Sequence, residues 1–198
     1  AFLPKNENEA HLWVNHETVT PYLLNGRARG SVPTKSQFRQ EAQMVGGTYT
    51  KLVKKDGQWV ADKTSRDNFS INALTRIPFA NREKVQGSRS ALGTLANCSG
   101  GVTPWGTILT CEENYRYFVG EVSFDKSAKR TMNSMVNAYK WDKHYDVPPE
   151  HYGWVVEVDP RKKSAKKLTA LGRFEHEGAC VVQTKSGRLV VYMGDDSP

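Results

Sequence analysis

Residues 93–114 read GTLANCSGGVTPWGTILTCEEN, and the rest of the chain is arranged around this stretch. Its first half, 93–106, contains Asn, Pro and several Gly residues, a composition typical of tight turns. Its second half, 107–111, is β-branched and apolar, which predicts a short buried strand. A thiol and two carboxylates close that strand, at Cys111, Glu112 and Glu113.

Acidic groups at the end of an apolar strand are costly to bury unless a cation or a basic group meets them. Two interpretations therefore stay open for Glu112 and Glu113: they bind a metal, or they face solvent at a strand end. A thiolate beside carboxylates favours a transition metal, because calcium has little affinity for sulfur.

Short strands separated by Gly, Asp and Pro turns, without a long amphipathic helix, predict an all-β fold. Hairpins are expected where turn residues separate two apolar runs, over 47–61, 152–173 and 179–193. We also expect strands or extended segments over 11–17, 68–76, 115–118 and 121–124, a short helix over 36–44, a loop over 77–92 and an irregular surface insertion over 125–150.

Carboxylates lie at the ends of four predicted strands. They are Glu17, the pair Glu112 and Glu113, the pair Glu175 and Glu177, and the pair Asp195 and Asp196. If these strand ends converge, their side chains supply hard oxygen ligands for calcium or ferric iron.

Four segments of the chain resemble the PhoX-type alkaline phosphatases, a family of secreted bacterial β-propeller phosphatases. They are VNHE at 14–17, NCSGGVTPWGTILTCEEN at 97–114, GRFEHEGA at 172–179 and YMGDD at 192–196. The resemblance implies a β-propeller, of which residues 1–198 form a single partial domain. At roughly 40–50 residues per blade, the chain offers about four blades. We expect it to be an N-terminal portion, with the remaining C-terminal part of the same propeller as its partner.

The resemblance also implies a function: hydrolysis of phosphate esters to inorganic phosphate at a cluster of Fe(III) and Ca²⁺ with one cysteine ligand. We assign that thiolate to Cys111, with Cys98 as its competitor. Arg173 is expected to meet an anionic ligand and His176 to support the cluster, although an ion pair and a packed strand also explain these two residues. The expected metal ligands are Glu17, Cys111, Glu112, Glu113, Glu177 and Asp195.

The sequence contains no serine nucleophile elbow, Walker loop or Ser-His-Asp arrangement, so metal-assisted hydrolysis is the expected mechanism. Two alternatives stay open. One is a calcium-stabilised propeller that binds a partner without catalysis, and the other is a lactonase- or phytase-like propeller hydrolase. Metal content distinguishes the first, because iron with calcium supports the phosphatase and calcium alone supports the scaffold. The thiol at Cys111 weighs against the second, because a site that holds only calcium does not need one.

Charge and cysteine content limit the other functions. The formal net charge of +7 favours anions, but the basic residues at 161–167 follow a turn signal and predict a solvated hairpin tip. No aromatic residues interleave with a basic stripe, so nucleic-acid binding is not expected. The three cysteines lack CxxC spacing, which argues against a disulfide framework or a zinc site, and Cys180 is expected to be buried.

The chain has no run of eighteen apolar residues, so we expect no membrane span. It begins without a basic and apolar leader, so an export signal is expected to be absent. A periplasmic or secreted location is implied by the family resemblance.

Overall fold

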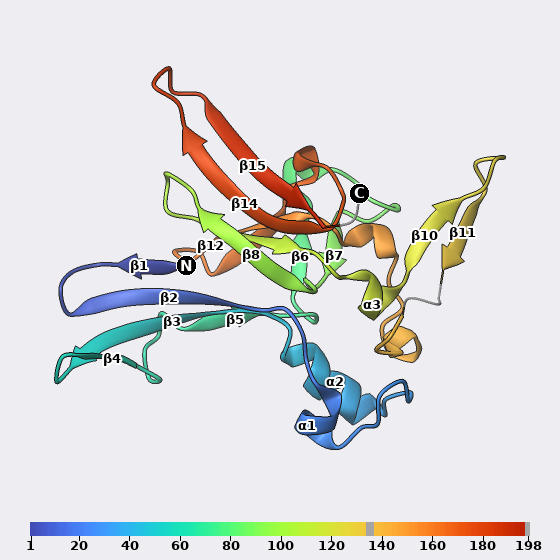
Figure 1. The fold of residues 1–198 in the computed structure, drawn as a ribbon, viewed down its shortest axis with the longest axis horizontal. Helices are drawn as coiled ribbons and strands as arrows, with labels where there is room; N and C mark the ends of the chain where they lie inside the picture. Colours follow the sequence, from blue (N-terminus) through green and yellow to red (C-terminus); the bar gives the residue numbers. More distant parts are fainter. Residues whose placement is uncertain (134–136, 197–198) are drawn as a thin grey trace.

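The computed structural model describes residues 1–133 and 137–196, and strands dominate them (Figure 1). The expected all-β class is confirmed. Three layers of antiparallel strands lie one above another in Figure 1, and their ends fan apart at the left of the view and approach one another towards its centre. In the described part of the chain, no helix is both long and apolar enough to cross a membrane.

The first layer is built on the pairing of β2 with β3. The hairpin that joins β3 to β4 turns at Asp56 and Gly57, whose φ angles are 50° and 79°, as the Asp-Gly signal predicts. The hairpin expected over 47–61 is therefore confirmed. The strands of this layer are β1 (Phe2–Pro4), β2 (Glu9–His16), β3 (Gly46–Lys55), β4 (Gln58–Ala61) and β5 (Phe69–Ile71).

The central layer has four antiparallel strands in the order β13-β12-β9-β8. Every residue of β9 is buried, which confirms the buried strand expected over 107–111. The hairpin expected over 152–173 is confirmed in part, because the second strand is Ser164–Lys167, whereas Thr169–Leu171 form a short 3₁₀ helix. The tip of the β12–β13 hairpin carries the exposed side chains of Arg161 and Lys162. The strands are β8 (Asn97–Val102), β9 (Ile108–Glu112), β12 (Val155–Asp159) and β13 (Ser164–Lys167).

The expectation of turns over 93–106 is only partly correct: residues 97–102 form strand β8, whereas 104–106 form a turn and Gly93 and Gly106 have φ angles of 82°. The glycines of β8 serve close packing. A Cβ atom on Gly100 would lie 1.9 Å from the carbonyl oxygen of Leu109, and one on Gly101 would lie 2.5 Å from that of Ala179. Glycine therefore lets β8 approach both neighbouring strands.

The third layer is the hairpin of β14 (His176–Gln183) and β15 (Leu189–Asp195), which confirms and lengthens the hairpin expected over 179–193. The central layer packs against it through an apolar cluster of Leu109, Cys111, Val155 and Ala179. The opposite face of the central layer packs against the first layer through a second apolar cluster, formed by Trp13, Tyr49, Ile71, Ile77, Ile108, Val156 and Val158. Successive residues of β9 thus face different layers, as strand geometry requires.

Helices and short strands surround one end of these layers. The helix α2 confirms the one expected over 36–44, and a capping box between Thr34 and Gln37 begins it. The remaining elements are α1 (Pro21–Asn25), α2 (Lys35–Gln43), α3 (Arg116–Val119), β6 (Arg76–Pro78), β7 (Ser90–Leu92), β10 (Glu121–Phe124), β11 (Arg130–Asn133), η1 (Ala80–Arg82), η3 (Trp141–Lys143), η4 (Pro149–His151) and η5 (Thr169–Leu171).

Several local expectations are wrong. Residues 115–118, expected to be extended, lie mostly in α3, and the expected loop 77–92 contains η1 and β7. Cys180 is exposed rather than buried, because β14 turns alternate side chains away from the central layer.

The segment 125–150 was expected to be an irregular surface insertion, but it contributes to a core. Trp141 is completely buried and packs edge-on against Phe38, and its indole nitrogen donates to Glu41 Oε2 at 2.8 Å. The segment also contains strand β11. Burial of a large aromatic side chain is favourable enough in free energy to hold an irregular segment against the core. Residues 134–136 of this segment lie outside the described residues.

Candidate metal centre

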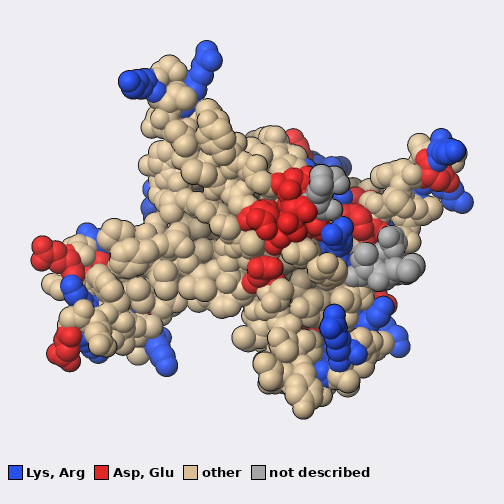
Figure 2. Space-filling view, in the orientation of Figure 1, with Lys and Arg blue, Asp and Glu red and all other residues tan. Residues whose placement is uncertain are grey.

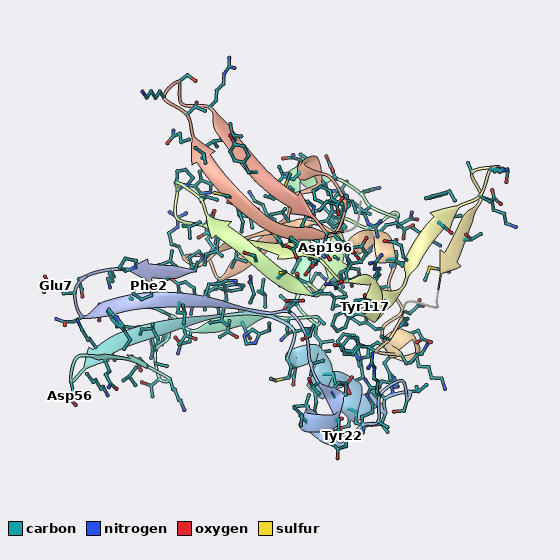
Figure 3. All side chains as sticks on the ribbon, in the orientation of Figure 1. Phe2, Glu7, Tyr22, Asp56, Tyr117 and Asp196 are labelled. Atoms are coloured by element: carbon teal, nitrogen blue, oxygen red, sulfur yellow. The ribbon has the colours of Figure 1, made fainter. Side chains whose placement is uncertain are left out.

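Acidic side chains gather on one face of the molecule, near the ends of the three layers (Figure 2). Glu17 directly follows β2, Glu113 directly follows β9 and Asp196 directly follows β15. Cys98 lies on β8 and Glu177 on β14. Figure 3 labels Asp196 at this convergence. Five strands from all three layers therefore bring candidate ligands to one place.

The ligand atoms form two groups. Glu17, Cys98 and Glu113 form the first, and Glu113, Glu177 and Asp196 form the second. Within each group the candidate ligand atoms lie within 4.8 Å of one another. Glu113 belongs to both groups, and its two carboxylate oxygens allow it to serve two cations at once. The geometry therefore fits a centre of more than one metal ion.

The electrostatics of the first group favour a cation. Burial, the largest cause, and the charges of Glu17, Glu177 and Asp196 together raise the pKa of Glu113 to about 7, although the interaction with Cys98 lowers it. Burial also raises the pKa of the Cys98 thiol to about 12, aided by Glu113 and Glu17. Among the described residues, no Lys, Arg or His forms an ion pair with the four carboxylates. A bound metal would supply the missing positive charge.

Cys111, the expected thiolate ligand, belongs to neither group in the described part of the chain. Its side chain is completely buried among Leu109, Val155 and Ala179. Burial raises the pKa of its thiol to about 12, so it behaves as a small apolar side chain. Cys98, the competitor named from the sequence, is the cysteine that lies in a candidate ligand group.

Glu112, another expected ligand, is held by a basic residue instead of facing the two groups. Its Oε1 accepts a hydrogen bond from Lys167 Nζ at 2.6 Å, and both side chains are completely buried. The side chains of Cys111 and Glu112 lie on opposite faces of the sheet, because successive residues of a strand point to opposite faces. Of these three neighbouring residues, Glu113, beyond the strand end, is the one whose carboxylate lies in the candidate ligand groups.

The end of β15 contributes Asp196 to the second group, where Asp195 was expected. Asp195 lies opposite His176 in the β14–β15 register, whereas the Asp196 amide donates to the Glu175 carbonyl at 3.1 Å. Glu177 joins the group as expected. The sequence shows the acidic pair Asp195 and Asp196, but it does not show how β15 aligns with β14, and this alignment decides which aspartate joins the group.

Glu175, two positions before Glu177 of the second group, forms an ion pair with Arg116. Its Oε1 is 2.9 Å from Arg116 Nε, yet within the described part of the chain neither Glu175 oxygen nor that nitrogen has an aligned hydrogen-bond partner. Burial raises the pKa of this carboxyl, Arg116 lowers it, and Asp196 and Asp195 raise it again. Buried carboxylate oxygens without hydrogen bonds are consistent with a cation nearby.

The two expected catalytic residues are engaged with protein groups. Arg173 donates to both oxygens of Glu121, at 2.9 and 3.1 Å, and to the Tyr152 carbonyl at 2.8 Å. The His176 Nε2 lies 3.1 Å from the Gly172 carbonyl oxygen, while its buried Nδ1 has no hydrogen-bond partner among residues 1–133 and 137–196. Burial lowers the pKa of His176, which favours the neutral ring. Their catalytic roles stay predictions.

Asn15 is a residue that sequence reasoning missed. Its Oδ1 accepts from Trp13 Nε1 at 2.6 Å and from Thr110 Oγ1 at 2.8 Å, and its Nδ2 donates to the Cys98 carbonyl oxygen. It thereby joins β2 to β8 and β9 next to Glu17. The signal was present, because Asn15 lies within the VNHE motif at 14–17.

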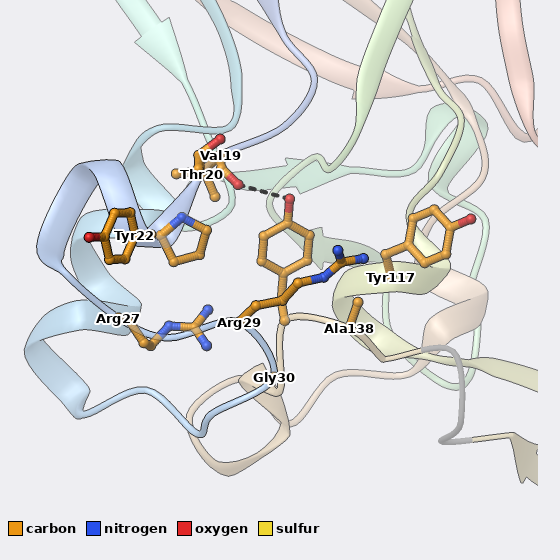
Figure 4. A pocket seen from close by; sticks show the side chains of 10 residues that line it. Val19, Thr20, Tyr22, Arg27, Arg29, Gly30, Tyr117 and Ala138 are labelled. Atoms are coloured by element: carbon orange, nitrogen blue, oxygen red, sulfur yellow. Dashed lines mark hydrogen bonds between the residues drawn. The ribbon is translucent and has the colours of Figure 1, made fainter.

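A separate pocket of about 430 Å³ lies beside α1 (Figure 4). Tyr22 and Tyr117 lie at its opposite sides in this view, and Tyr139 donates from its hydroxyl to the Val19 carbonyl at 2.9 Å. Its lining includes no member of either ligand group. The acidic convergence is therefore the better candidate for chemistry.

Comparison with known proteins places these features in a family. A family model described as alkaline phosphatase PhoX matches residues 1–198. No curated protein matches the chain. Among solved structures, the chain is similar to Pseudomonas fluorescens PhoX in complex with vanadate, a transition state analogue, with 31% sequence identity and a TM-score of 0.84. The match covers 99% of this chain and 38% of that one. The chain belongs to the PhoX alkaline phosphatase family.

Proposed function

We propose that this chain supplies part of the metal centre of a phosphatase that hydrolyses phosphate esters and releases inorganic phosphate. The observation that carries the proposal is the convergence of one thiol and four carboxylates from five strands, with Glu113 shared between two groups. Family membership supports the reaction class, and the similar solved structure holds a transition state analogue.

The donor atoms fit iron and calcium. The first group, Glu17, Cys98 and Glu113, combines sulfur with oxygen, which suits Fe(III). The second group, Glu113, Glu177 and Asp196, is all oxygen and suits Ca²⁺. When bound, such cations neutralise phosphate oxygens and lower the pKa of bound water.

The protonation of two ligands and a hydrogen bond from Asn15 affect how this centre would bind metal. Glu113 and Cys98 must release their protons to serve as ligands, so metal binding is coupled to pH. Asn15 holds the Cys98 backbone in place from the neighbouring layer. The formal net charge of +7 favours the approach of anionic esters to the molecule.

We further propose that the layers are blades of a β-propeller. The four-stranded antiparallel sheet β13-β12-β9-β8 has the strand number of a blade, and the approach of strand ends suits a central channel. The chain spans 38% of the length of the similar solved structure. In a full-length protein, further blades would complete the ring and the ligand shell. We also propose a periplasmic or secreted location, because the resemblance to this family implies export.

Elemental analysis of the full-length protein, combined with hydrolysis of a chromogenic phosphate ester, tests the proposal. Bound iron and calcium together with ester hydrolysis support it. Calcium alone without hydrolysis would instead identify a calcium-stabilised binding module. Calcium alone with activity towards lactones or phytate would identify a different propeller hydrolase.

A further inference from the structure

Lys167 is a buried lysine that the proposed phosphatase chemistry does not use. Its side chain has no solvent exposure. Its Nζ donates to Glu112 Oε1 at 2.6 Å and to the His151 carbonyl at 2.7 Å, and it lies 4.3 Å from the centre of the Tyr152 ring. Protein groups therefore surround the ammonium group on several sides.

The Glu112 carboxylate ties this lysine to two further segments of the chain. Its Oε1 also accepts from the Leu95 amide at 3.3 Å, and its Oε2 accepts from the Trp154 amide at 3.1 Å. One carboxylate thus joins the end of β13, the start of β12 and the segment before β8. This arrangement satisfies both carboxylate oxygens in the interior of the protein.

The segments held in this way carry two proposed metal ligands. Glu112 directly precedes Glu113, and Leu95 lies three positions before Cys98. The backbones are tied as well, because the Glu113 amide donates to the Ala96 carbonyl at 3.1 Å. A shift in the ion pair would therefore displace the thiol and the shared carboxylate relative to one another.

Net stability is a poor explanation for this ion pair. Removing two charges from water costs about as much as their attraction returns, and apolar replacements of a complete buried pair are often tolerated. A buried ion pair with fixed partners can nevertheless select one arrangement of the surrounding backbone. That property matters most next to a site that needs its ligand atoms placed accurately.

We propose that the Lys167–Glu112 pair is a positioning device for the metal centre. This inference rests on the proposed function and extends it to two residues that do not touch the metal. The pair fixes the backbone on both sides, so that the Cys98 thiolate and the Glu113 carboxylate meet the same cation.

A second buried ion pair provides a matched control. Arg27 Nε lies 2.7 Å from Glu41 Oε1, and the side chains are 3% and 0% exposed. This pair joins α2 to the segment after α1 and also accepts from Trp141. No proposed ligand lies within three positions of either residue. Its removal should therefore disturb stability without displacing a ligand.

The test compares two double variants of the full-length protein, Glu112→Gln with Lys167→Met and Glu41→Gln with Arg27→Met. Circular dichroism gives the folded fraction, and competition with a chelator gives the iron affinity per folded chain. We expect only the Lys167 variant to lose iron affinity, by roughly 10- to 100-fold, as when a residue supporting a metal ligand is lost. Equal affinities in the two double variants would overturn the inference.

A milder variant keeps the test decisive if the first double variant does not fold. Lys167→Gln removes the charge and retains a hydrogen-bond donor for Glu112. We expect a smaller loss of iron affinity in the same direction, and an unchanged affinity would overturn the inference.

Ester hydrolysis by the unmodified protein tests the proposed function separately. A protein that binds iron but hydrolyses no phosphate ester would overturn the phosphatase proposal and leave the affinity comparison valid. A protein that binds neither iron nor calcium would overturn both.

Discussion

The Cys98 Sγ and a Glu113 carboxylate oxygen lie within 4.8 Å of one another at the convergence of β8 and β9. Burial raises the pKa of both groups, to about 12 for the thiol and about 7 for the carboxyl. Without a metal, the thiol therefore keeps its proton at neutral pH. A cation that binds both groups must displace these protons, so metal binding at this pair depends on pH.

We predict that Cys98→Ser removes most of the bound iron from the full-length protein. The expected loss of iron affinity exceeds the roughly 10- to 100-fold cost of losing a residue that only supports a ligand. Cys111→Ser is the matched control, because its thiol is buried in an apolar cluster away from both ligand groups. Iron bound per chain, measured by elemental analysis, distinguishes the variants. The reverse result would return the thiolate role to Cys111.

Glu113→Gln should reduce both iron and calcium, because Glu113 is shared by the two ligand groups. Glu157→Gln is the control: Glu157 is also buried, but it accepts from Trp105 Nε1 at 2.8 Å and Thr107 Oγ1 at 2.6 Å at the opposite end of the central layer. We expect the control to change thermal stability and to keep both metals. Equal metal content in the two variants would contradict the shared-ligand assignment.

The stability of the metal-free protein should fall as the pH rises from about 4.5 to about 7. The pKa of Glu113 is raised from 4.5 to about 7 in the folded protein, so the folded state binds more protons than the unfolded state in this range. The contribution of Glu113 is fully favourable below pH 4.5 and is lost as the pH passes 7. Thermal unfolding in a chelator should show a steeper decline for the unmodified protein than for Glu113→Gln. Identical pH profiles would exclude Glu113 as the titrating group.

Arg173→Met should lower the free energy of unfolding by about 1.5–3 kcal/mol, the range for hydrogen bonds to charged groups. Arg173 donates to Glu121 and to two backbone carbonyl groups, of Tyr152 and Pro149. If these contacts are its whole role, KM for a phosphate ester stays unchanged while Tm falls. An increased KM with little change in Tm would instead support the predicted contact with an anionic ligand.

The sequence by itself determined the local elements of this protein. Asp56-Gly57 fixed a hairpin, because these residues adopt positive φ angles readily. The apolar run at 107–111 formed a fully buried strand, and the resemblance in four motifs identified the family. These features depend on residues that are close together in the sequence, so a sequence pattern can predict them.

Tertiary structure decided which of these residues meet. On β9, Cys111 faces the third layer, whereas Glu112 faces the other side and reaches Lys167, a partner 55 positions away. Cys98 and Asp196, rather than Cys111 and Asp195, lie in the candidate ligand groups because of how the three layers pack. Strand periodicity fixes that neighbours point to opposite faces, but only long-range packing fixes which face turns towards the metal centre.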